Sequence, residues 1–449
     1  MDLVALIPEF GGLIYTIIAF VVALSVIVAV HEYGHYIVGR WSGIHAEVFS
    51  IGFGPVLWSR IDKRGTRWQI AALPFGGYVK FLGDANAASG KDTDAMEAAA
   101  ADPAALRRTM HGAPLWARSA TVAAGPVFNF VMSIIVFAGI IMARGVVSDP
   151  FTVGEIRDLP QGQYELQVGD QIISIEGLAM PGMDDGEAWS AFRADLPEKE
   201  TLTYKVVRDG TEQEVSGPYL YPPFVVQVAP RSAAMDSGMQ PDDVLVAVDG
   251  TPIFAFDQLK DRVEASDGRE LAVELWRGGE LVEVGLAARR TDEPDPEGGF
   301  RNAWRIGIAG GMAISPATEF GGPLQAIGGG ISQTGDIISR SLSGLYHMIV
   351  GTISTCNIAG PIGIAETSGD MAAQGASNFI AFIAMLSTAV GLVNLFPIPA
   401  LDGGHLVFYA YEAATGRPPN DMALRILMTV GIALILSVML FAIGNDLFC

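Results

Sequence analysis

The chain has 449 residues, of which 50% are hydrophobic and only 17% are charged, against about 25% charged residues in an average soluble protein. This apolar content excludes a disordered chain. The apolar residues also fall in long blocks, which argues against a wholly soluble enzyme. The formal net charge of −21 argues against a nucleic-acid partner, because the phosphate backbone attracts basic proteins.

Four charge-free stretches of the chain are long enough to cross a lipid bilayer. They comprise residues 13–30, 119–143, 378–401 and 426–443. Each meets the minimum of about 17 apolar residues that a helix needs to span the hydrocarbon. Acidic Asp2 and Glu9 precede the first stretch without a basic cluster, so we expect a retained helix and not a cleavable signal peptide. The sequence therefore predicts a polytopic α-helical membrane protein with four transmembrane helices.

The segments between the predicted spans differ in charge. Residues 39–118 carry more basic than acidic side chains, whereas residues 145–375 carry more than twice as many acidic as basic ones. Basic residues close to the ends of spans favour the cytoplasmic side. We therefore expect residues 39–118 in the cytoplasm, and both termini and the large acidic segment outside it.

Residues 45–82 are predicted to form a small β-meander. Four strand-like runs (AEVFSIG, PVLWSRI, TRWQIAAL and GGYVKFL) alternate with Gly-Pro, Lys-Arg-Gly and Pro-Phe-Gly-Gly turns. The runs are unusually apolar for a cytoplasmic surface, so we expect the meander to associate with the membrane. Irregular backbone at that depth must be covered by protein or line a cavity. Residues 84–112 are rich in Ala, Asp and Gly and indicate a weakly helical linker.

The acidic segment contains an approximate internal repeat. Residues 168–177 (VGDQIISIEG) match residues 240–250 (QPDDVLVAVDG) as a turn, a strand and an acidic turn that ends in Gly. A strand, a loop and a short helix ending at Gly238 precede the second copy. This arrangement resembles bacterial PDZ domains, which bind extended peptides by adding them as a strand. Asp242 stands where such domains usually have Gly, and generic β-hairpins are the alternative interpretation.

The strongest chemical signal directly continues the first predicted span. It reads His31-Glu32-Tyr33-Gly34-His35, and on a helix residues i and i+4 lie on one face, so both imidazoles can reach one metal ion. Glu32 lies one step around the helix, where it can accept a proton from a water in the site. A charged group at the centre of a transmembrane helix costs about 2.5–3.5 kcal/mol on insertion scales, so these residues indicate a functional partner. Interfacial His residues that face water are the alternative.

A catalytic zinc site needs three protein ligands and a water, so a third ligand must come from elsewhere. The first and third spans both run toward the cytoplasm, and the third ends in the sequence NLFPIPALDGG. We therefore expect Asp402 at the depth of the two His residues. Pro397 and Pro399 break the helix before it, and the following pair, Gly403 and Gly404, allows close approach of the backbone to metal or substrate. His405 is a competing ligand, and a turn carboxylate is the alternative role of Asp402.

The two motifs together resemble the site-2 protease family of intramembrane zinc metalloproteases. Four spans with two extracytoplasmic PDZ-like repeats are similar to its bacterial regulator-of-sigma-E protease branch. The resemblance implies that His31, His35 and Asp402 bind Zn2+ and that Glu32 is the catalytic residue.

The same resemblance implies supporting roles for other residues. Gly125-Pro126-Val-Phe-Asn129 in the second span is similar to the family's Gly-Pro-x-x-Asn pattern, which would place Asn129 near the site; a helix-packing role is its alternative. Asn394, Pro397 and Pro399 would contact the substrate backbone, and Asn129 would also be a substrate-binding residue. The β-meander would receive the unwound substrate as an added strand.

By this resemblance we expect hydrolysis of peptide bonds in the transmembrane segment of a single-span protein. Candidate substrates are an anti-sigma factor in envelope-stress signalling and leftover signal peptides. The expected setting is the bacterial inner membrane, with the active site near its cytoplasmic side and peptide C-termini bound by PDZ domains outside. The alternative is a catalytically inactive PDZ scaffold, and the complete set of His, Glu and Asp residues argues against it. A transporter would show an inverted repeat of spans, which we do not find.

These interpretations predict an order of segments along the chain. We expect residues 1–38 as the first transmembrane helix, 39–83 as the membrane-associated β-loop, 84–114 as a cytoplasmic linker, 115–144 as the second helix, 145–222 and 223–292 as PDZ domains, 293–376 as a linker with an amphipathic helix at 337–352, 377–404 as the third helix, 405–422 as a cytoplasmic turn and 423–445 as the fourth helix. The sequence GPIG at 360–363 also resembles the family, but only a turn is expected there.

Overall fold

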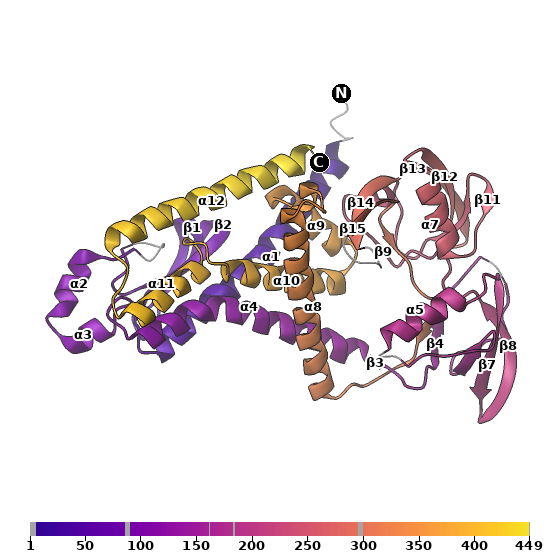
Figure 1. Ribbon diagram of the computed structural model, residues 1–449, viewed down its shortest axis with the longest axis horizontal. Helices are drawn as coiled ribbons and strands as arrows, with labels where there is room; N and C mark the ends of the chain where they lie inside the picture. The colour runs from indigo at the N-terminus through magenta and orange to yellow at the C-terminus, as the bar shows by residue number, and fades with distance from the viewer. Residues whose placement is uncertain (1–5, 86–89, 161, 183–184, 295–299, 449) are drawn as a thin grey trace. The chain divides into compact units, whose positions relative to one another are not determined.

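The computed structural model describes residues 6–85, 90–160, 162–182, 185–294 and 300–448. The chain divides into two compact units. We call one the sheet unit, built from Ile141–Pro323 and Ile349–Ser354, and the other, which holds the remaining described residues, the helical unit (Figure 1).

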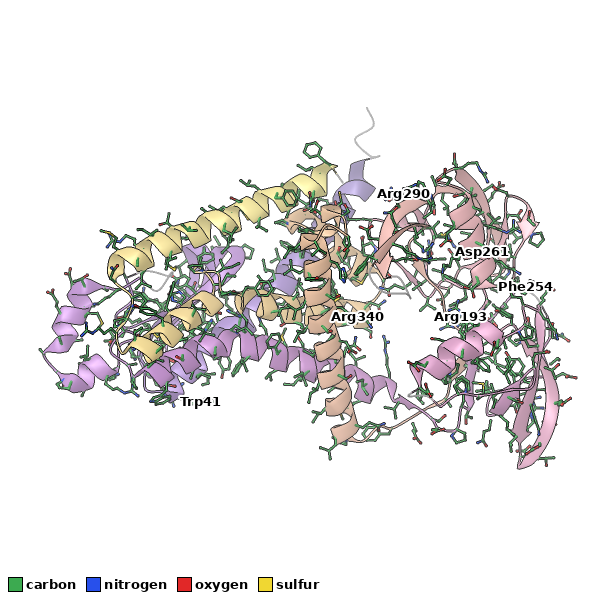
Figure 2. The ribbon with its side chains drawn as sticks, in the orientation of Figure 1. Trp41, Arg193, Phe254, Asp261, Arg290 and Arg340 are labelled. Atoms are coloured by element: carbon green, nitrogen blue, oxygen red, sulfur yellow. The ribbon has the colours of Figure 1, made fainter. Side chains whose placement is uncertain are left out.

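Among the residues that the structure describes, four helices are long and apolar enough to cross a membrane, which fits the four predicted spans. They are α1 (Leu6–Trp41), α4 (Leu115–Arg144), α10 (Ala376–Asn394) and α12 (Asp421–Phe448). Only 11% of the apolar window of α12 is buried inside the protein, so most of its surface is suited to contact lipid. At the cytoplasm-facing end predicted for α1, Trp41 is 73% exposed (Figure 2).

The third span is shorter than the sequence predicted. α10 ends at Asn394 and not at residue 401, because Pro397 and Pro399 cannot continue a helix. The chain turns there, with the amide of Leu401 donating to the carbonyl of Ile398 at 2.8 Å. Residues 405–422, expected as a turn, are instead largely helical, since α11 covers Asp402–Thr415.

Glycine explains how α11 packs so closely beneath the end of α10. A Cβ on Gly403 would collide with the carbonyl oxygens of Leu395 and Phe396, and a Cβ on Gly404 would collide with that of Ile398. Only residues without a side chain fit here. The sequence predicted that these glycines bring the backbone close to metal or substrate, whereas here they bring it close to the backbone of residues 395–399; the helix that begins there was not predicted.

The β-meander is present, with a topology that differs from the prediction. The four predicted runs join into two long strands, β1 (Ala46–Ile61) and β2 (Arg67–Phe81). Both strands bend, so the first half of β1 lies between the two halves of β2: Ser50 pairs with Tyr78 on one side and with Gln69 on the other. Gly52 permits the bend, because its φ is +89° and a Cβ would lie 2.7 Å from the carbonyl oxygen of Leu73.

A small core joins this sheet to α1 and α4. Its buried side chains come from the end of α1, from both strands and from the segment that enters α4: Tyr36, Ile44, Ala46, Phe49, Val79, Phe81, Met110, Ala113, Ala117 and Val122. The linker between β2 and α4 contains α2 (Thr93–Ala100) and α3 (Pro103–Arg107), in agreement with the weak helicity expected. The sheet is therefore fixed against the helix that carries the His motif.

The segment before α10 contains two more helices, α8 (Pro323–Ile349) and α9 (Pro361–Ala373). α8 includes most of the predicted amphipathic helix but begins well before it. α9 begins inside the GPIG sequence, so the turn expected there is a helix N-terminus. The carboxylate of Asp446 on α12 accepts hydrogen bonds from the amides of Gly360, Ile362 and Gly363 at 2.9, 3.1 and 3.1 Å.

The sheet unit is built from two matching four-stranded sheets, with strand orders β6-β5-β7-β8 and β11-β10-β12-β13. The first comprises β5 (Gln171–Ile175), β6 (Leu178–Ala179), β7 (Thr201–Arg208) and β8 (Thr211–Pro218), with α5 (Gly186–Asp195). The second comprises β10 (Val244–Val248), β11 (Thr251–Pro252), β12 (Glu270–Arg277) and β13 (Glu280–Ala287), with α6 (Ala233–Asp236) before it and α7 (Phe256–Ala265) within it. Each sheet has its own hydrophobic core.

The internal repeat extends to buried ion pairs. Asp170 receives two bonds from Arg208, both of 2.7 Å, and Asp243 receives two of 2.7 Å from Arg277. The two carboxylates also accept the amides of Gln167 and Gln240, respectively. Two copies with the same buried pair at the same place in the sheet are a true structural repeat.

The departure from Gly in the second copy is also explained. Asp242 has a φ of +74°, and the matching Gly169 has a φ of +94°. Both residues therefore occupy the left-handed region, which Gly adopts freely and Asp tolerates better than most residues.

The segment after residue 293 does not begin as a linker, contrary to the prediction. Its short strands pair back onto both halves of the sheet unit: β16 (Ile308–Ala309) with β9 (Gln227–Val228), β17 (Ile314–Pro316) with β4 (Val153–Ile156), and β18 (Thr318–Glu319) with β3 (Val146–Val147). Such short strands carry no periodic signal in the sequence. Their pairing partners alone define them.

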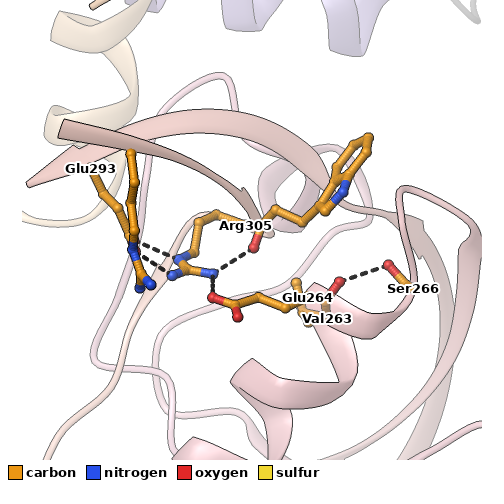
Figure 3. Close-up of polar contacts among 7 residues, drawn as sticks. Val263, Glu264, Ser266, Glu293 and Arg305 are labelled. Carbon is orange, nitrogen blue, oxygen red and sulfur yellow. Dashed lines mark hydrogen bonds and ion pairs between the residues drawn. The ribbon is translucent and has the colours of Figure 1, made fainter. Parts of the chain in front are cut away.

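The hairpin of β14 (Arg289–Pro294) and β15 (Phe300–Arg305) is fixed to α7 by one cation. Arg305 lies 2.6 Å from Glu293 and 2.6 Å from Glu264 of α7 (Figure 3). A second ion pair, between Arg193 of α5 and Asp257 of α7, joins the two halves at 2.9 Å. The two repeats thus contact each other within one unit and are not two independent domains.

Candidate metal and catalytic site

Three ligand atoms converge beside α1. His31 Nε2 lies 3.1 Å from Asp402 Oδ2 and 3.1 Å from His35 Nε2, and His35 Nε2 lies 3.5 Å from Asp402 Oδ2. The α-helical spacing of the two His residues places both rings on one face, as predicted. Asp402 reaches them from the first turn of α11.

The spacing of these atoms fits a tetrahedral metal ion. Ligand bonds of about 2.0–2.2 Å at tetrahedral angles place the ligand atoms about 3.3–3.6 Å apart, close to the three observed separations. Asp402 Oδ2 is buried and makes no well-aligned hydrogen bond, although both ring nitrogens lie close to it. A cation between the three atoms would satisfy this oxygen. One carboxylate and two imidazoles are a typical donor set for a catalytic zinc ion.

The far side of each imidazole ring is held by α4. His35 Nδ1 lies 2.9 Å from the carbonyl oxygen of Thr121, and His31 Nδ1 lies 3.2 Å from the side-chain amide of Asn129. Bonds of this kind orient metal-binding His rings. Asn129, expected near the site, therefore contacts a ligand of the candidate metal.

Glycine allows α4 to pass this close to the rings. A Cβ on Gly125 would collide with the ring of His35 and would lie 2.8 Å from His31 Cε1. On the other helix, a Cβ on Gly34 would lie 2.5 Å from the carbonyl oxygen of Ala124. The Gly-Pro-x-x-Asn motif thus has two local effects, a close helix approach at Gly125 and a polar contact at Asn129.

A cavity of about 240 Å³ opens at the site. Its lining includes His31, Glu32, His35 and Asp402 together with Gly77, Tyr78 and Val79 from β2. Glu32 therefore faces the same space as the three ligand atoms. Asn394 also lines the cavity, with its amide group bonded to the carbonyl of Val390 at 3.0 Å. Pro397 and Pro399 are not among the described residues that line it.

The sequence of the chain matches a known family over most of its length. The sequence profile of Peptidase family M50 matches residues 19–438.

The chain belongs to Peptidase family M50.

Curated relatives of this M50 peptidase cover nearly its whole length. It is 37% identical over 434 residues to the protein named "Putative zinc metalloprotease R01501" from Rhizobium meliloti (strain 1021), with 96% of each chain covered. It is 31% identical over 469 residues to the regulator of sigma-E protease RseP from Escherichia coli (strain K12), with 96% of this chain and 98% of the relative covered. RseP from Salmonella typhimurium (strain 14028s / SGSC 2262) is 30% identical over 472 residues, with 97% and 99% covered.

The M50 site contains residues that sequence reasoning missed. Arg118 of α4 and Glu412 of α11 form an ion pair of 2.7 Å, and the Arg118 guanidinium lies 5.2 Å from the centre of the Tyr409 ring. Burial raises the pKa of Tyr409 to about 12, so its hydroxyl stays protonated at neutral pH. His405, considered as a competing ligand, lines the cavity but is not part of the three-residue group. No motif in the sequence links Arg118 to Glu412, because they meet only through helix packing.

Proposed function

We propose that this M50 peptidase is an intramembrane zinc metalloprotease that hydrolyses peptide bonds in the transmembrane segments of single-span proteins. The observation that carries the proposal is the convergence of His31, His35 and Asp402 on a metal-sized space at one end of an apolar helix. The names of the relatives, which include zinc metalloprotease and RseP, support the same chemistry.

The proposed roles follow from the position of each side chain. His31, His35 and Asp402 would hold Zn2+ through Nε2, Nε2 and a carboxylate oxygen. Zinc, when bound, polarises the carbonyl of the scissile bond and lowers the pKa of water toward neutrality. Glu32 takes the proton of the attacking water on its carboxylate and returns it to the nitrogen of the leaving amine.

The substrate must lose its helical hydrogen bonds before a carbonyl can reach the site. Among the described residues, segment 77–81 of β2 pairs with β1 on one side only, and its residues Gly77, Tyr78 and Val79 line the cavity. We propose that an unwound substrate adds to this edge as a strand, since main-chain bonds from the edge replace those of the helix. Asn394, which lines the same cavity, is proposed to bond the substrate backbone. Pro397 and Pro399 shape the turn that delivers Asp402.

The proposed setting is the inner membrane, with residues 39–118 in the cytoplasm and the sheet unit and both termini outside. The basic composition of the first segment supports this orientation. We propose that the repeats of the sheet unit are PDZ domains that bind peptide C-termini, and that they admit only substrates already trimmed by another protease. Anti-sigma factors and leftover signal peptides are the proposed substrates, and envelope-stress signalling is the proposed pathway.

The catalytic proposal is tested with the full chain in proteoliposomes that contain a single-span reporter. Glu32→Gln should retain zinc yet lose cleavage by at least about 100-fold, because a general base contributes about 10²–10⁴-fold. Glu97→Gln on the exposed face of α2 is the matched control and should cleave like the wild type. Equal cleavage by wild type and Glu32→Gln would refute the assigned mechanism.

The proposal that the sheet unit acts as a filter, admitting only trimmed substrates, is tested by removing the whole sheet unit. A deletion of residues 150–290 would leave β16 and β17 without their partner strands, so Gly145 should instead be joined to Gly322. The deletion variant should cleave the untrimmed reporter, which the wild type should leave intact. An untrimmed reporter that stays intact, beside a trimmed one that is still cleaved, would contradict the filter.

A further inference from the structure

Asn129 stands out as a fully buried polar side chain whose hydrogen bonds are incomplete. Its relative exposure is 0%, its Nδ2 lies 3.2 Å from His31 Nδ1, and its Oδ1 has no hydrogen-bond partner. Buried side-chain amides normally have their polar atoms paired. The contact with a candidate metal ligand therefore calls for a chemical explanation.

The orientation of the amide follows from the chemistry of the His31 ring. His31 directs Nε2 at Asp402 and His35, so Nε2 is the atom that faces the metal. A neutral imidazole that binds a metal through Nε2 carries its proton on Nδ1, and Nδ1 is then a donor. The group opposite Nδ1 must be an acceptor, which the amide nitrogen is not. Oxygen and nitrogen of a side-chain amide have nearly the same shape and are assigned from such networks.

We propose that Asn129 is a positioning residue for the metal ligand His31, with its Oδ1 accepting the hydrogen bond from His31 Nδ1–H. The proposal rests on the proposed metal site. Rotation of the amide exchanges the positions of Oδ1 and Nδ2 and leaves one of them unpaired in either orientation. The proton on Nδ1, which metal binding requires, therefore decides the orientation. This role replaces the substrate contact expected for Asn129.

The two ligand rings are held in different ways. His35 Nδ1 faces the backbone carbonyl of Thr121, an acceptor that no substitution removes. His31 depends on a side chain. The backbone around that side chain is firmly held, because the carbonyl oxygen of Asn129 accepts hydroxyl groups from Ser133 of α4 at 3.0 Å and Ser387 of α10 at 3.1 Å. A Cβ on Gly391 of α10 would lie 3.2 Å from Asn129 Cβ, so α10 leaves the amide little room to move.

The test compares two substitutions of similar shape. Asn129→Leu removes the acceptor, and Asn129→Asp keeps an oxygen opposite His31. Loss of such an outer contact typically lowers metal affinity by about 10–100-fold. Zinc transfer from the purified full-length protein to a chromophoric chelator measures this without reference to cleavage. We expect Asn129→Leu to weaken zinc binding by about 10–100-fold and Asn129→Asp to stay within about threefold of the wild type.

Two reference variants separate the possible failures. Asn394→Leu, altered at a cavity residue whose amide bonds the Val390 carbonyl and not the His31 ring, should raise the reporter KM while zinc affinity stays unchanged. His31→Ala should lose zinc. If His31→Ala retains zinc, the metal assignment is wrong. If His31→Ala loses zinc while Asn129→Leu holds it as tightly as the wild type, or if Asn129→Asp is as weak as Asn129→Leu, the proposal for Asn129 is overturned.

Misfolding is controlled by the thermal unfolding of each variant after metal removal. Asn129→Leu should unfold within a few degrees of the metal-free wild type, because leucine has the same branching at Cγ as asparagine. If Asn129→Leu unfolds at a much lower temperature, the comparison is made between Asn129→Thr and Asn129→Val instead. Threonine is smaller than asparagine and keeps an acceptor oxygen, and valine has the shape of threonine without that oxygen. Tighter zinc binding by the Thr variant is expected, and equal binding by the two would overturn the proposal.

Discussion

Arg118 of α4 and Glu412 of α11 form a bidentate ion pair, with Nη2–Oε1 and Nη1–Oε2 distances of 2.7 and 3.0 Å. Their side chains are only 13% and 18% exposed. Because α11 begins at Asp402 and α4 holds both His rings, this pair fixes the carboxylate side of the candidate metal site relative to the imidazole side. We call the Arg118–Glu412 pair a structural clamp; no motif in the sequence predicts it.

Removal of one partner of this clamp should destabilise the helical unit. Loss of one partner of a fully buried pair costs about 3–5 kcal/mol, and we expect less here because both side chains remain partly exposed. Arg118→Gln and Glu412→Gln should each lower the thermal unfolding temperature and weaken zinc binding. The double variant should be less damaged than the sum of the two, since it leaves no unpaired charge. Additive effects in this cycle would contradict a direct clamp.

Substitution of Gly125 should disrupt the metal site through sterics alone. The added Cβ of Gly125→Ala would collide with the His35 ring, so α4 or the rings must shift. We expect zinc content and cleavage to fall together, while far-UV circular dichroism stays unchanged. Gly139→Ala is the matched control on the same helix, because nothing lies within 4 Å of its added Cβ. Full zinc content in Gly125→Ala would show that the close approach is not required.

The sheet unit should lose stability in acid through the buried carboxylate of Asp170. Burial alone would raise the pKa of Asp170, but the bonds from Arg208 and from the amide of Gln167 outweigh it, and the folded pKa lies below the usual value. Because the folded pKa is lower than the unfolded pKa of about 3.9, the ionised carboxylate stabilises the folded protein at any pH above the unfolded pKa. This contribution is lost as pH falls below about 3.9 and through the folded pKa. Amide hydrogen exchange in β5 and β7, corrected for the intrinsic exchange rate, should therefore accelerate as pH is lowered below about 3.9.

A substitution of the same residue checks the cause of this acid sensitivity. Asp170→Asn should exchange faster at neutral pH and lose most of the pH dependence in β5 and β7. Asp195→Asn, at the exposed end of α5, should behave like the wild type. If Asp170→Asn kept the full acid dependence, other carboxylates would be responsible.

The carboxylate of Asp446 should hold the start of α9 against α12. It accepts three backbone amides, and the loss of a helix N-cap typically costs about 0.5–2 kcal/mol. Asp446→Ala should increase hydrogen exchange in residues 360–364. Ser437→Ala, whose hydroxyl bonds only its own helix at Ala433, is the control on α12. Unchanged protection in Asp446→Ala would mean that packing, not capping, holds α9.

The sequence by itself determined the features that depend on short spacing and local composition. Apolar length defined the four spans, and the i, i+4 spacing placed His31 and His35 on one face of α1. The repeated turn-strand-turn pattern indicated the two matching sheets. Pro397 and Pro399 correctly indicated where the third helix breaks, although the span was drawn past Asn394.

Tertiary structure alone decided which distant residues meet. The return of β16, β17 and β18 to the sheet unit, the start of α11 at Asp402, the clamp of Arg118 on Glu412 and the contact of Asn129 with His31 all join residues far apart in the chain. Each of these depends on how whole helices and strands pack, because the side chains involved carry no periodic or local signal. Local physics therefore selected the candidate ligands, and packing across the fold set their distances and their partners.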